Sequence, residues 1–590
     1  MAWKHIERIR KQLSKEEGTI YKEWGGRLRV ALTFPNTYYV GMSSLALQVM
    51  YRAFNQHADV VCERTFWHKE AYEAGYPLLT YESQRPVTDT DIFAFTISYE
   101  MDYFNIADML RQARIPILAQ ERLHSRQYDG RPWPLLIAGG PAVTMNPEPI
   151  APFFDVMAIG EGEEIIAWII RAVQEHGDDR EATLHALARV PGLYVPLLHP
   201  SDPTHPDFHP IERLWVRDVT QVPPMTVIHT PNTEFSGMHL IEIARGCGRG
   251  CRFCLAGYIY RPPREQPLEQ VLEWARAGLQ HTDRIGLVSA AVSDYSHIDE
   301  LAIRLREMGA RISVSSMRTD PISVPLVEAL RASGTRTLTI APEAGSQRLR
   351  DVINKTQRVD DLMAAVDLAE RLRFPQLKLY FMLGHPTETE EDIDELIRFV
   401  REVRGRFSRN LVINATPFVP KPHTPFQWMA MTPASVIKAR QKRITRALAR
   451  DQVTVRADNP RWAEVQGVLA RGDRRLAPIL ATLERISPRA FFEALAEAGL
   501  SKEMYLGERQ IGEPLPWDIV ASGVRPKYFL RELRLAHASR TGHHCPPQAL
   551  GCLSCGSCDP AWAFRDRGGV PRPKQKTGAR NTPIPIPLES

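Results

Sequence analysis

Short apolar runs alternate with amphipathic stretches through the first third of the chain. Apolar runs of this length predict buried strands, and amphipathic stretches predict helices. The expected strands are 27–34, 91–98, 115–119, 134–138 and 155–159, and the expected helices are 43–54, 101–113 and 165–175. Strands and helices in alternation indicate a mainly parallel sheet covered by helices on both faces. The pattern therefore predicts a doubly wound, Rossmann-like α/β domain over residues 27–200.

The same alternation of apolar runs and amphipathic stretches occurs in the middle of the chain. The expected strands there are 239–244, 284–289, 311–316, 337–341, 376–383 and 411–417. The expected helices between them are 268–281, 298–307, 324–332, 359–372 and 390–404. Successive βα units predict a partial (β/α)₆ barrel over residues 236–430, with its active site at the carboxyl ends of the strands.

The remaining segments differ in character. They are an N-terminal helix within 1–26, a Pro-, His- and Asp-rich linker over 201–235 with one short strand at 225–229, a mainly helical region over 431–540, a cysteine-rich stretch over 541–560, and a basic tail over 561–590. The helical region begins with a basic amphipathic helix, 434–449. The tail is rich in Pro, Arg and Lys, which predicts disorder.

Composition narrows the class of protein. The chain has 590 residues, 44% hydrophobic and 24% charged, which is ordinary for globular domains. Its net charge of +5 is compatible with RNA or anionic cofactors and demonstrates neither. Because no apolar run is long enough for a membrane span and the first residues lack a secretory signal, we expect a cytoplasmic protein.

Seven of the eight cysteines fall in two tight groups, which favours metal binding over disulfides. The first group is Cys247, Cys251 and Cys254, spaced C-x₃-C-x₂-C directly after the first expected barrel strand. Three thiolates on one loop can hold three irons of a [4Fe–4S] cluster and leave the fourth iron open. A structural zinc ion would lack its fourth ligand here. The lone Cys62 is expected to be a buried apolar residue.

This loop, C-x₃-C-x-aromatic-C after a first barrel strand, resembles the signature of the radical S-adenosylmethionine (SAM) superfamily. The resemblance implies that the open iron chelates SAM, and that the reduced cluster cleaves SAM to methionine and a 5′-deoxyadenosyl radical. It also implies that Phe253 packs beside the adenine. A small reductant protein, flavodoxin or ferredoxin, would be the electron-donating partner.

Further positions match the superfamily at the ends of later strands. Glu343, in the segment 339–346, is expected to hold the ribose or amino group of SAM, although it also suits the N-terminus of the following helix. Gly384 lies in a turn, 383–389, that resembles the superfamily's G-x-P-G-E-T turn. Ser316 and Arg318 follow the third strand and could also reach SAM.

A doubly wound domain ahead of such a barrel resembles the cobalamin-binding subclass. The resemblance places cobalamin near Asn36, Ser98, Gly139 and Gly140, at the ends of the expected strands. Many cobalamin domains carry D-x-H-x-x-G after the first strand, but residues 34–44 contain no histidine. Cobalamin could therefore bind without a protein ligand to cobalt, or the domain could have lost it. The segments 34–38, 98–100, 418–428 and 515–518, together with the cysteine loop, resemble an uncharacterised bacterial family of such proteins with a C-terminal cysteine cluster. This resemblance spans nearly the whole chain.

The second cysteine group is Cys545, Cys552, Cys555 and Cys558. Four thiolates at this density suit either a zinc knuckle or a second Fe–S cluster. The leading hypothesis for function is cobalamin-dependent methylation of an unactivated carbon. The alternative is a radical SAM enzyme that modifies tRNA or rRNA by methyl or methylthio transfer without cobalamin, with the basic helix and the C-terminal cysteines as the RNA contact.

Overall fold

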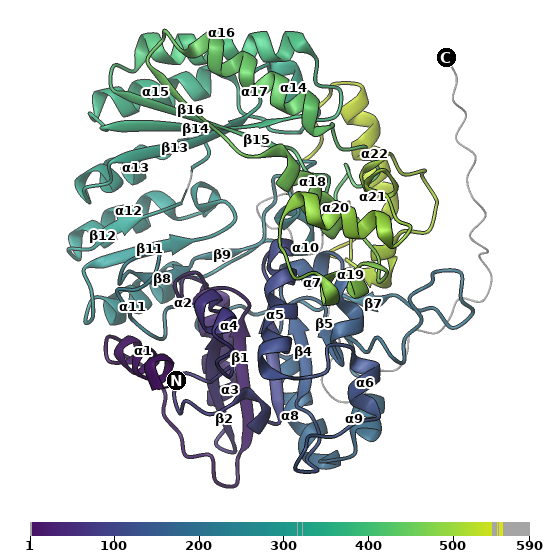
Figure 1. Ribbon diagram of the computed structural model, residues 1–590. Coiled ribbons are helices and arrows are strands. Elements are labelled where there is room, and N and C mark those ends of the chain that lie inside the picture. The colour runs from purple at the N-terminus through teal and green to yellow at the C-terminus, as the bar shows by residue number, and fades with distance from the viewer. Residues whose placement is uncertain (1–2, 316, 321, 546–551, 553, 559–590) are drawn as a thin grey trace.

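The computed structural model describes residues 3–315, 317–320, 322–545, 552 and 554–558 (Figure 1). Its N-terminal half is built on a six-stranded sheet with the strand order β2-β1-β3-β4-β5-β6. The strands are β1 (Leu28–Phe34), β2 (Val60–Phe66), β3 (Ile92–Thr96), β4 (Leu135–Gly139), β5 (Val156–Ala158) and β6 (Leu193–Tyr194). All neighbours are parallel except β6, which runs antiparallel to β5. The predicted doubly wound α/β domain is confirmed.

Helices cover both faces of this sheet. One face carries α3 (Leu45–Asn55), α8 (Ile165–His176) and α9 (Arg180–Leu187). The other carries α5 (Tyr103–Ala113) together with α18 (Pro460–Arg471), α19 (Leu476–Thr482) and α20 (Pro488–Glu497) from the C-terminal region. The rings of Phe104 and Phe491 meet edge to face, with their centroids 5.8 Å apart. The C-terminal helices therefore share a hydrophobic core with the first domain.

Two predicted strands are wrong. Residues 115–119 form no strand; the carbonyls of Pro116 and Ile117 accept hydrogen bonds from Arg122, and α6 (Ala119–Leu123) begins at the expected strand's last residue. The linker segment 225–229 makes only two isolated bridges, one between Met225 and Ile241 and one between His229 and Glu17.

The central region contains seven parallel strands in two sheets. They are β8 (His239–Glu242), β11 (Arg284–Val288) and β12 (Arg311–Ser313) in the first, and β13 (Thr337–Glu343), β14 (Gln376–Leu383), β15 (Asn410–Pro417) and β16 (Val453–Ala457) in the second. A parallel bridge between Met317 and Ile340 links the two sheets. The helices α11 (Leu268–Gly278), α12 (Ile298–Glu307), α13 (Val324–Ala332), α15 (Val359–Arg371) and α16 (Glu390–Arg406) alternate with these strands. The predicted partial barrel is confirmed, with β16 as an additional strand.

The two halves stack, with the N-terminal sheet below the barrel strands in Figure 1. The predicted basic helix is confirmed as α17 (Ala434–Leu448), which packs against α16. Its Arg440 and Arg443 form ion pairs with acidic residues at the start of α16 and just before it. In the described part of the chain, no helix combines the length and apolarity needed to cross a membrane. The tail 561–590 lies outside the described residues.

Candidate functional site: the cysteine loop and the cavity between the two sheets

The first cysteine group lies on the loop that follows β9 (Ala244–Arg245), at the carboxyl end of the first barrel strand. Cys251 is buried, and Cys247 and Cys254 are half-buried. Burial, together with the nearby thiols of Cys251 and Cys254, raises the pKa of Cys247 to about 12. Metal ions bind the thiolate form, so a metal bound here has to displace protons.

Backbone contacts hold this loop in a tight curl. Gly246 has a φ of +85°, and a Cβ there would collide with the carbonyl oxygen of Tyr260. The carbonyl of Gly250 accepts hydrogen bonds from the Asn354 side chain (3.0 Å) and the Tyr258 hydroxyl (3.1 Å). Gly250 also has a positive φ, +69°, so both positions favour glycine.

A buried ion pair ties the loop to the C-terminal region. Arg252 lies between two of the cysteines and pairs with Glu532 of α22 (Pro526–His537) at 3.1 Å, and neither side chain is exposed to solvent. Its guanidinium also donates to the carbonyls of Asp351, Val352 and Arg540. The loop therefore depends on a helix almost 300 residues away in sequence.

The residues expected around SAM surround the cysteine loop. Arg318 Nη1 lies 3.8 Å from the Sγ of Cys251. Glu343 has a φ of +66° and pairs with Lys355 at 3.3 Å, and the charge of Lys355 also reaches the thiol of Cys254. Ser316 lies outside the described residues.

Phe253 and Gly384 lie beside a histidine that the sequence did not single out. The ring of His385 lies 5.9 Å from that of Phe253, centroid to centroid. Burial lowers the pKa of His385 to about 3, against a hydrogen bond to the backbone of Glu343, which raises it. The sequence could have pointed to His385, because it follows Gly384 directly in the turn that resembles the superfamily's pattern.

A cavity of about 520 Å³ lies between the N-terminal sheet and the barrel. Its apolar walls come from α3 and α8, and its other boundary comes from the cysteine loop through Arg245 and Gly246. Gly139 and Gly140 line it as expected. Gly140 has a φ of +110°, and a Cβ there would lie 2.5 Å from the carbonyl oxygen of Ile97.

Two other residues expected at this cavity lie outside its lining. The side-chain amide of Asn36 donates to Asp102 at 2.7 Å, and Ser98 is exposed. Both follow strands of the same sheet, but their side chains lie elsewhere. The structure thus brings together only the two glycines of the four residues predicted for cobalamin.

An ion network joins the two halves at the edge of the cavity. The Glu161 carboxylate accepts hydrogen bonds from both terminal guanidinium nitrogens of Arg264, at 2.6 and 2.9 Å. It accepts a third from Arg245, at 3.1 Å. Arg245 also pairs with Glu163 and Glu242. Burial alone would raise the pKa of Glu161, but the two arginines outweigh it and hold the pKa at about 2. The residue before the cysteine loop is thereby fixed to the N-terminal domain.

Comparisons with known proteins agree with this geometry. A profile of the radical SAM superfamily matches residues 241–400, and a profile of the N-terminal region of radical SAM proteins matches residues 46–196. The uncharacterized protein MJ0966 of Methanocaldococcus jannaschii is 33% identical over 487 residues, which cover 81% of this chain and 96% of that protein. The chain belongs to the radical SAM superfamily.

Two other likenesses are more distant in sequence. The ribosomal protein uS12 methylthiotransferase RimO of Chlorobaculum parvum is 27% identical over 202 residues, or 31% of this chain and 44% of that enzyme. The radical SAM methyltransferase TsrM from Kitasatospora setae, solved with cobalamin and a [4Fe–4S] cluster bound, has a TM-score of 0.50 at 14% identity, covering 80% of this chain and 99% of TsrM. The latter likeness shows that this chain has the fold of TsrM.

The residues present fit the cofactors of a radical SAM protein. Three thiols on one curled loop, with Arg318 beside one of them, supply the donors and a compensating charge for a [4Fe–4S] cluster. Among the described residues, no three His, Cys, Asp or Glu side chains are arranged to hold a single metal ion. The cavity has the volume and apolar character of a ligand site, and both Gly139 and Gly140 line it. None of the described residues that line it is a histidine, as expected from the missing D-x-H-x-x-G.

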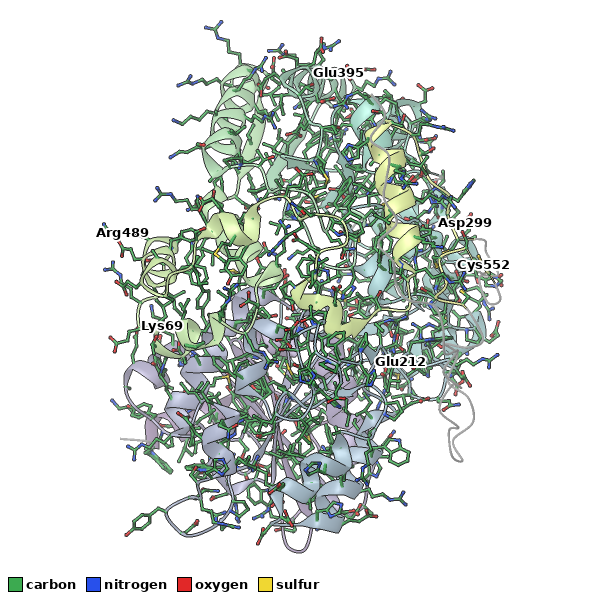
Figure 2. All side chains as sticks on the ribbon, turned by 90° about the vertical axis from the view of Figure 1, so that its right-hand side faces the viewer. Lys69, Glu212, Asp299, Glu395, Arg489 and Cys552 are labelled. Carbon is green, nitrogen blue, oxygen red and sulfur yellow. The ribbon has the colours of Figure 1, made fainter. Side chains whose placement is uncertain are left out.

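The second cysteine group lies against the first. The backbone N–H of Cys545 donates to the carbonyl of Gly248 at 2.8 Å. Cys555 and Cys558 are buried, and Cys552 is labelled near the edge of the molecule in Figure 2. Burial and the other three thiols raise the pKa of Cys558 to about 11. The second group therefore contacts the first through the backbone of Cys545.

Proposed function

We propose that this radical SAM protein is a cobalamin-dependent methyltransferase that methylates an unactivated carbon. The observation that carries the proposal is the cavity of about 520 Å³ bounded by the glycine pair of one domain and the cysteine loop of the other. A ligand held against Gly139 and Gly140 would share the cavity with Gly246, the residue just before Cys247. The TsrM-like fold supports the same conclusion.

The cysteine loop would generate the radical. Cys247, Cys251 and Cys254 would hold the [4Fe–4S] cluster, which when bound supplies the electron that cleaves SAM. Lys355 holds the carboxylate of Glu343 in place at 3.3 Å, so that this group is preorganised for a polar partner such as the SAM ribose or amino group. Phe253 offers an aromatic face to the adenine.

The N-terminal domain would hold cobalamin, which when bound supplies a carrier for the methyl group. The glycine pair permits close approach to the backbone. The apolar side chains of Leu45, Met50 and Ile165 line the same cavity and would exclude water from a bound corrin or its tail. The ion network around Glu161 fixes this domain against the barrel.

Cobalamin binding is tested by purifying the protein anaerobically with hydroxocobalamin. We expect about one cobalamin per chain from the corrin absorbance. In Gly139→Leu the new side chain would occupy the cavity, and cobalamin binding should be lost. The new Cβ would not be strained, because its nearest neighbour would be the Ala158 Cβ at 3.6 Å. Gly405→Leu, at an exposed position of α16 with nothing within 4 Å, is the matched control and should retain it. A wild-type protein without corrin absorbance would contradict the proposal.

SAM cleavage is tested separately. The reconstituted protein with a strong reductant should form 5′-deoxyadenosine, and Cys251→Ala should form none. Equal amounts from both proteins would show that the loop does not hold the catalytic cluster. Replacing the chemical reductant with flavodoxin or ferredoxin tests the proposed electron donor.

Methylthio transfer without cobalamin is the second candidate, favoured by the partial likeness to RimO. The two reactions differ in their products, because only methylthio transfer adds sulfur to the substrate. RNA remains a proposed target of this alternative. Arg440 and Arg443 already pair with acidic residues of the chain, so they offer less positive charge to a phosphate backbone than the sequence suggested.

A further inference from the structure

The C-terminal cysteines have the spacing of a cluster-binding loop. Cys552, Cys555 and Cys558 are spaced C-x₂-C-x₂-C, as in the runs that hold [4Fe–4S] clusters in bacterial ferredoxins, whereas structural zinc sites usually combine two separate pairs of ligands. The fourth thiol, Cys545, comes from the segment just before. Cys555 and Cys558 are buried.

Two buried guanidinium groups lie beside these thiols. Arg261 and Arg213 are 1% and 5% exposed, and in the described part of the chain neither has a carboxylate within ion-pair distance. Arg261 donates a hydrogen bond to Cys555, while Arg213 donates to the backbone carbonyls of Ser522 and Arg261. One terminal nitrogen of each arginine, Nη2 of Arg261 and Nη1 of Arg213, has no hydrogen-bond partner among the described residues.

Such cations need negative charge nearby. Burying a guanidinium without a counterion is costly, so buried charges are normally paired. Four thiolates around a metal centre carry a net negative charge and would neutralise both arginines.

The second group also touches the first directly. Besides the bond from Cys545 to Gly248, the ring Nδ1 of His544 lies 2.6 Å from the carbonyl oxygen of Arg249. A Cβ at Gly248 would lie 3.0 Å from the Cβ of Cys545, so glycine permits this contact. Arg261 lies beside both groups, because a Cβ at Gly250 would come within 3.3 Å of its Nη2.

We propose that Cys545, Cys552, Cys555 and Cys558 bind a second [4Fe–4S] cluster, packed against the loop of Cys247, Cys251 and Cys254, with the cation of Arg261 beside both. All four irons of this cluster would have a thiolate ligand, so it would not bind SAM through an open iron. The site does not depend on the proposed methyl transfer or on cobalamin.

Metal analysis of the full chain, after anaerobic reconstitution with iron and sulfide, tests the site. We expect about eight irons and eight sulfides per chain. The double variant Cys555→Ala/Cys558→Ala should lose about half of both, and so should the triple variant Cys247→Ala/Cys251→Ala/Cys254→Ala. Cys62→Ala, at a buried cysteine outside both groups, is the matched control and should keep the wild-type content. About four irons in the wild type, or one zinc per chain that disappears in the double variant, would overturn the proposal.

Spectroscopy distinguishes loss of the second cluster from general misfolding. The double variant should keep a [4Fe–4S] EPR signal that changes when SAM is added, because the open iron belongs to the first loop. The triple variant should keep a signal that SAM does not change. A triple variant without any cluster signal, but with wild-type circular dichroism, would show that the second cysteines hold no cluster. Because neither readout involves cobalamin or product, failure here leaves the proposed methyltransferase reaction standing.

Discussion

Glu161 and Arg264 form a bidentate ion pair, with the shorter nitrogen–oxygen distance 2.6 Å, across the boundary between the N-terminal sheet and the barrel. Both side chains are buried. The pair lies at the edge of the cavity, since Glu161 contributes to its lining. The relative placement of the two halves therefore rests partly on one carboxylate.

Removing that carboxylate should destabilise the protein. In Glu161→Gln, Arg264 loses its buried counterion, and we expect a loss of about 3–5 kcal/mol in the free energy of unfolding. Glu175→Gln, which removes only an exposed pair with Arg171 on α8, should cost less than about 1 kcal/mol. Denaturant unfolding measures both. Equal midpoints for the two variants would refute the importance of the buried pair.

Arg252 should control how firmly the cysteine loop is held. Arg252→Met leaves the buried Glu532 with only the longer ion pair to Arg531 at 3.9 Å, so both stability and the iron content after reconstitution should fall. The double variant Arg252→Met/Glu532→Met removes the stranded charge as well and should recover most of the stability. Arg534→Met, at an exposed position of α22, is the control. If the single variant retains wild-type iron content, the ion pair between Arg252 and Glu532 is not needed to hold the cysteine loop.

The raised pKa of Asp102 predicts that the free energy of unfolding depends on pH. Burial raises the pKa of its carboxyl to about 7, against the hydrogen bond from Asn36, which lowers it. The folded state therefore binds a proton that the unfolded state releases at about pH 4. Its contribution to stability is full below about pH 4 and is lost as the pH rises toward 7. In Asp102→Asn this part of the decline should disappear, as measured by unfolding free energies at several pH values. An unchanged slope would argue against the raised pKa.

Gly384 should not tolerate a side chain. Its φ is +90°, and a Cβ would lie 2.6 Å from the Ile437 Cδ1 and 2.9 Å from the Thr432 Cβ. Gly384→Ala should lose on the order of 2 kcal/mol or more of stability, from backbone strain and overpacking. Gly405→Ala, in an open position of α16, should be neutral or stabilising by up to about 1 kcal/mol. Thermal unfolding and SAM affinity measured on both would separate a structural effect from a binding effect.

The sequence predicted most barrel elements because their periodicity is strong. The expected bounds of α12 and α13 agree with the structure residue for residue. The missed strand β2 shows the limit of such patterns. It contains Glu63 and Arg64 yet is buried throughout, because Arg64 pairs with Glu16 and Glu82. Ion pairs between distant segments let a charged stretch occupy a core position, and no local pattern reveals them.

The candidate site also combines features that the sequence predicts with features that only distant contacts determine. The cysteine motif identified the loop of Cys247 because its ligands are adjacent in sequence. The contact of Cys545 with Gly248 could not be predicted, since it joins segments nearly 300 residues apart through backbone groups that every residue carries. Asn36 and Ser98 were expected at the cavity from their positions after strands. Strand ends define an edge of a sheet, but they do not determine which face a side chain reaches.

The packing of α18–α20 on the N-terminal sheet has a consequence for biosynthesis. The ribosome completes this sheet long before it makes the helices that cover one of its faces. During that interval the apolar side chains around Phe104 lack the contact with Phe491. A nascent chain in this state exposes hydrophobic surface and is prone to aggregate, so it is a natural client for chaperones. Truncation before residue 460 would make that exposure permanent.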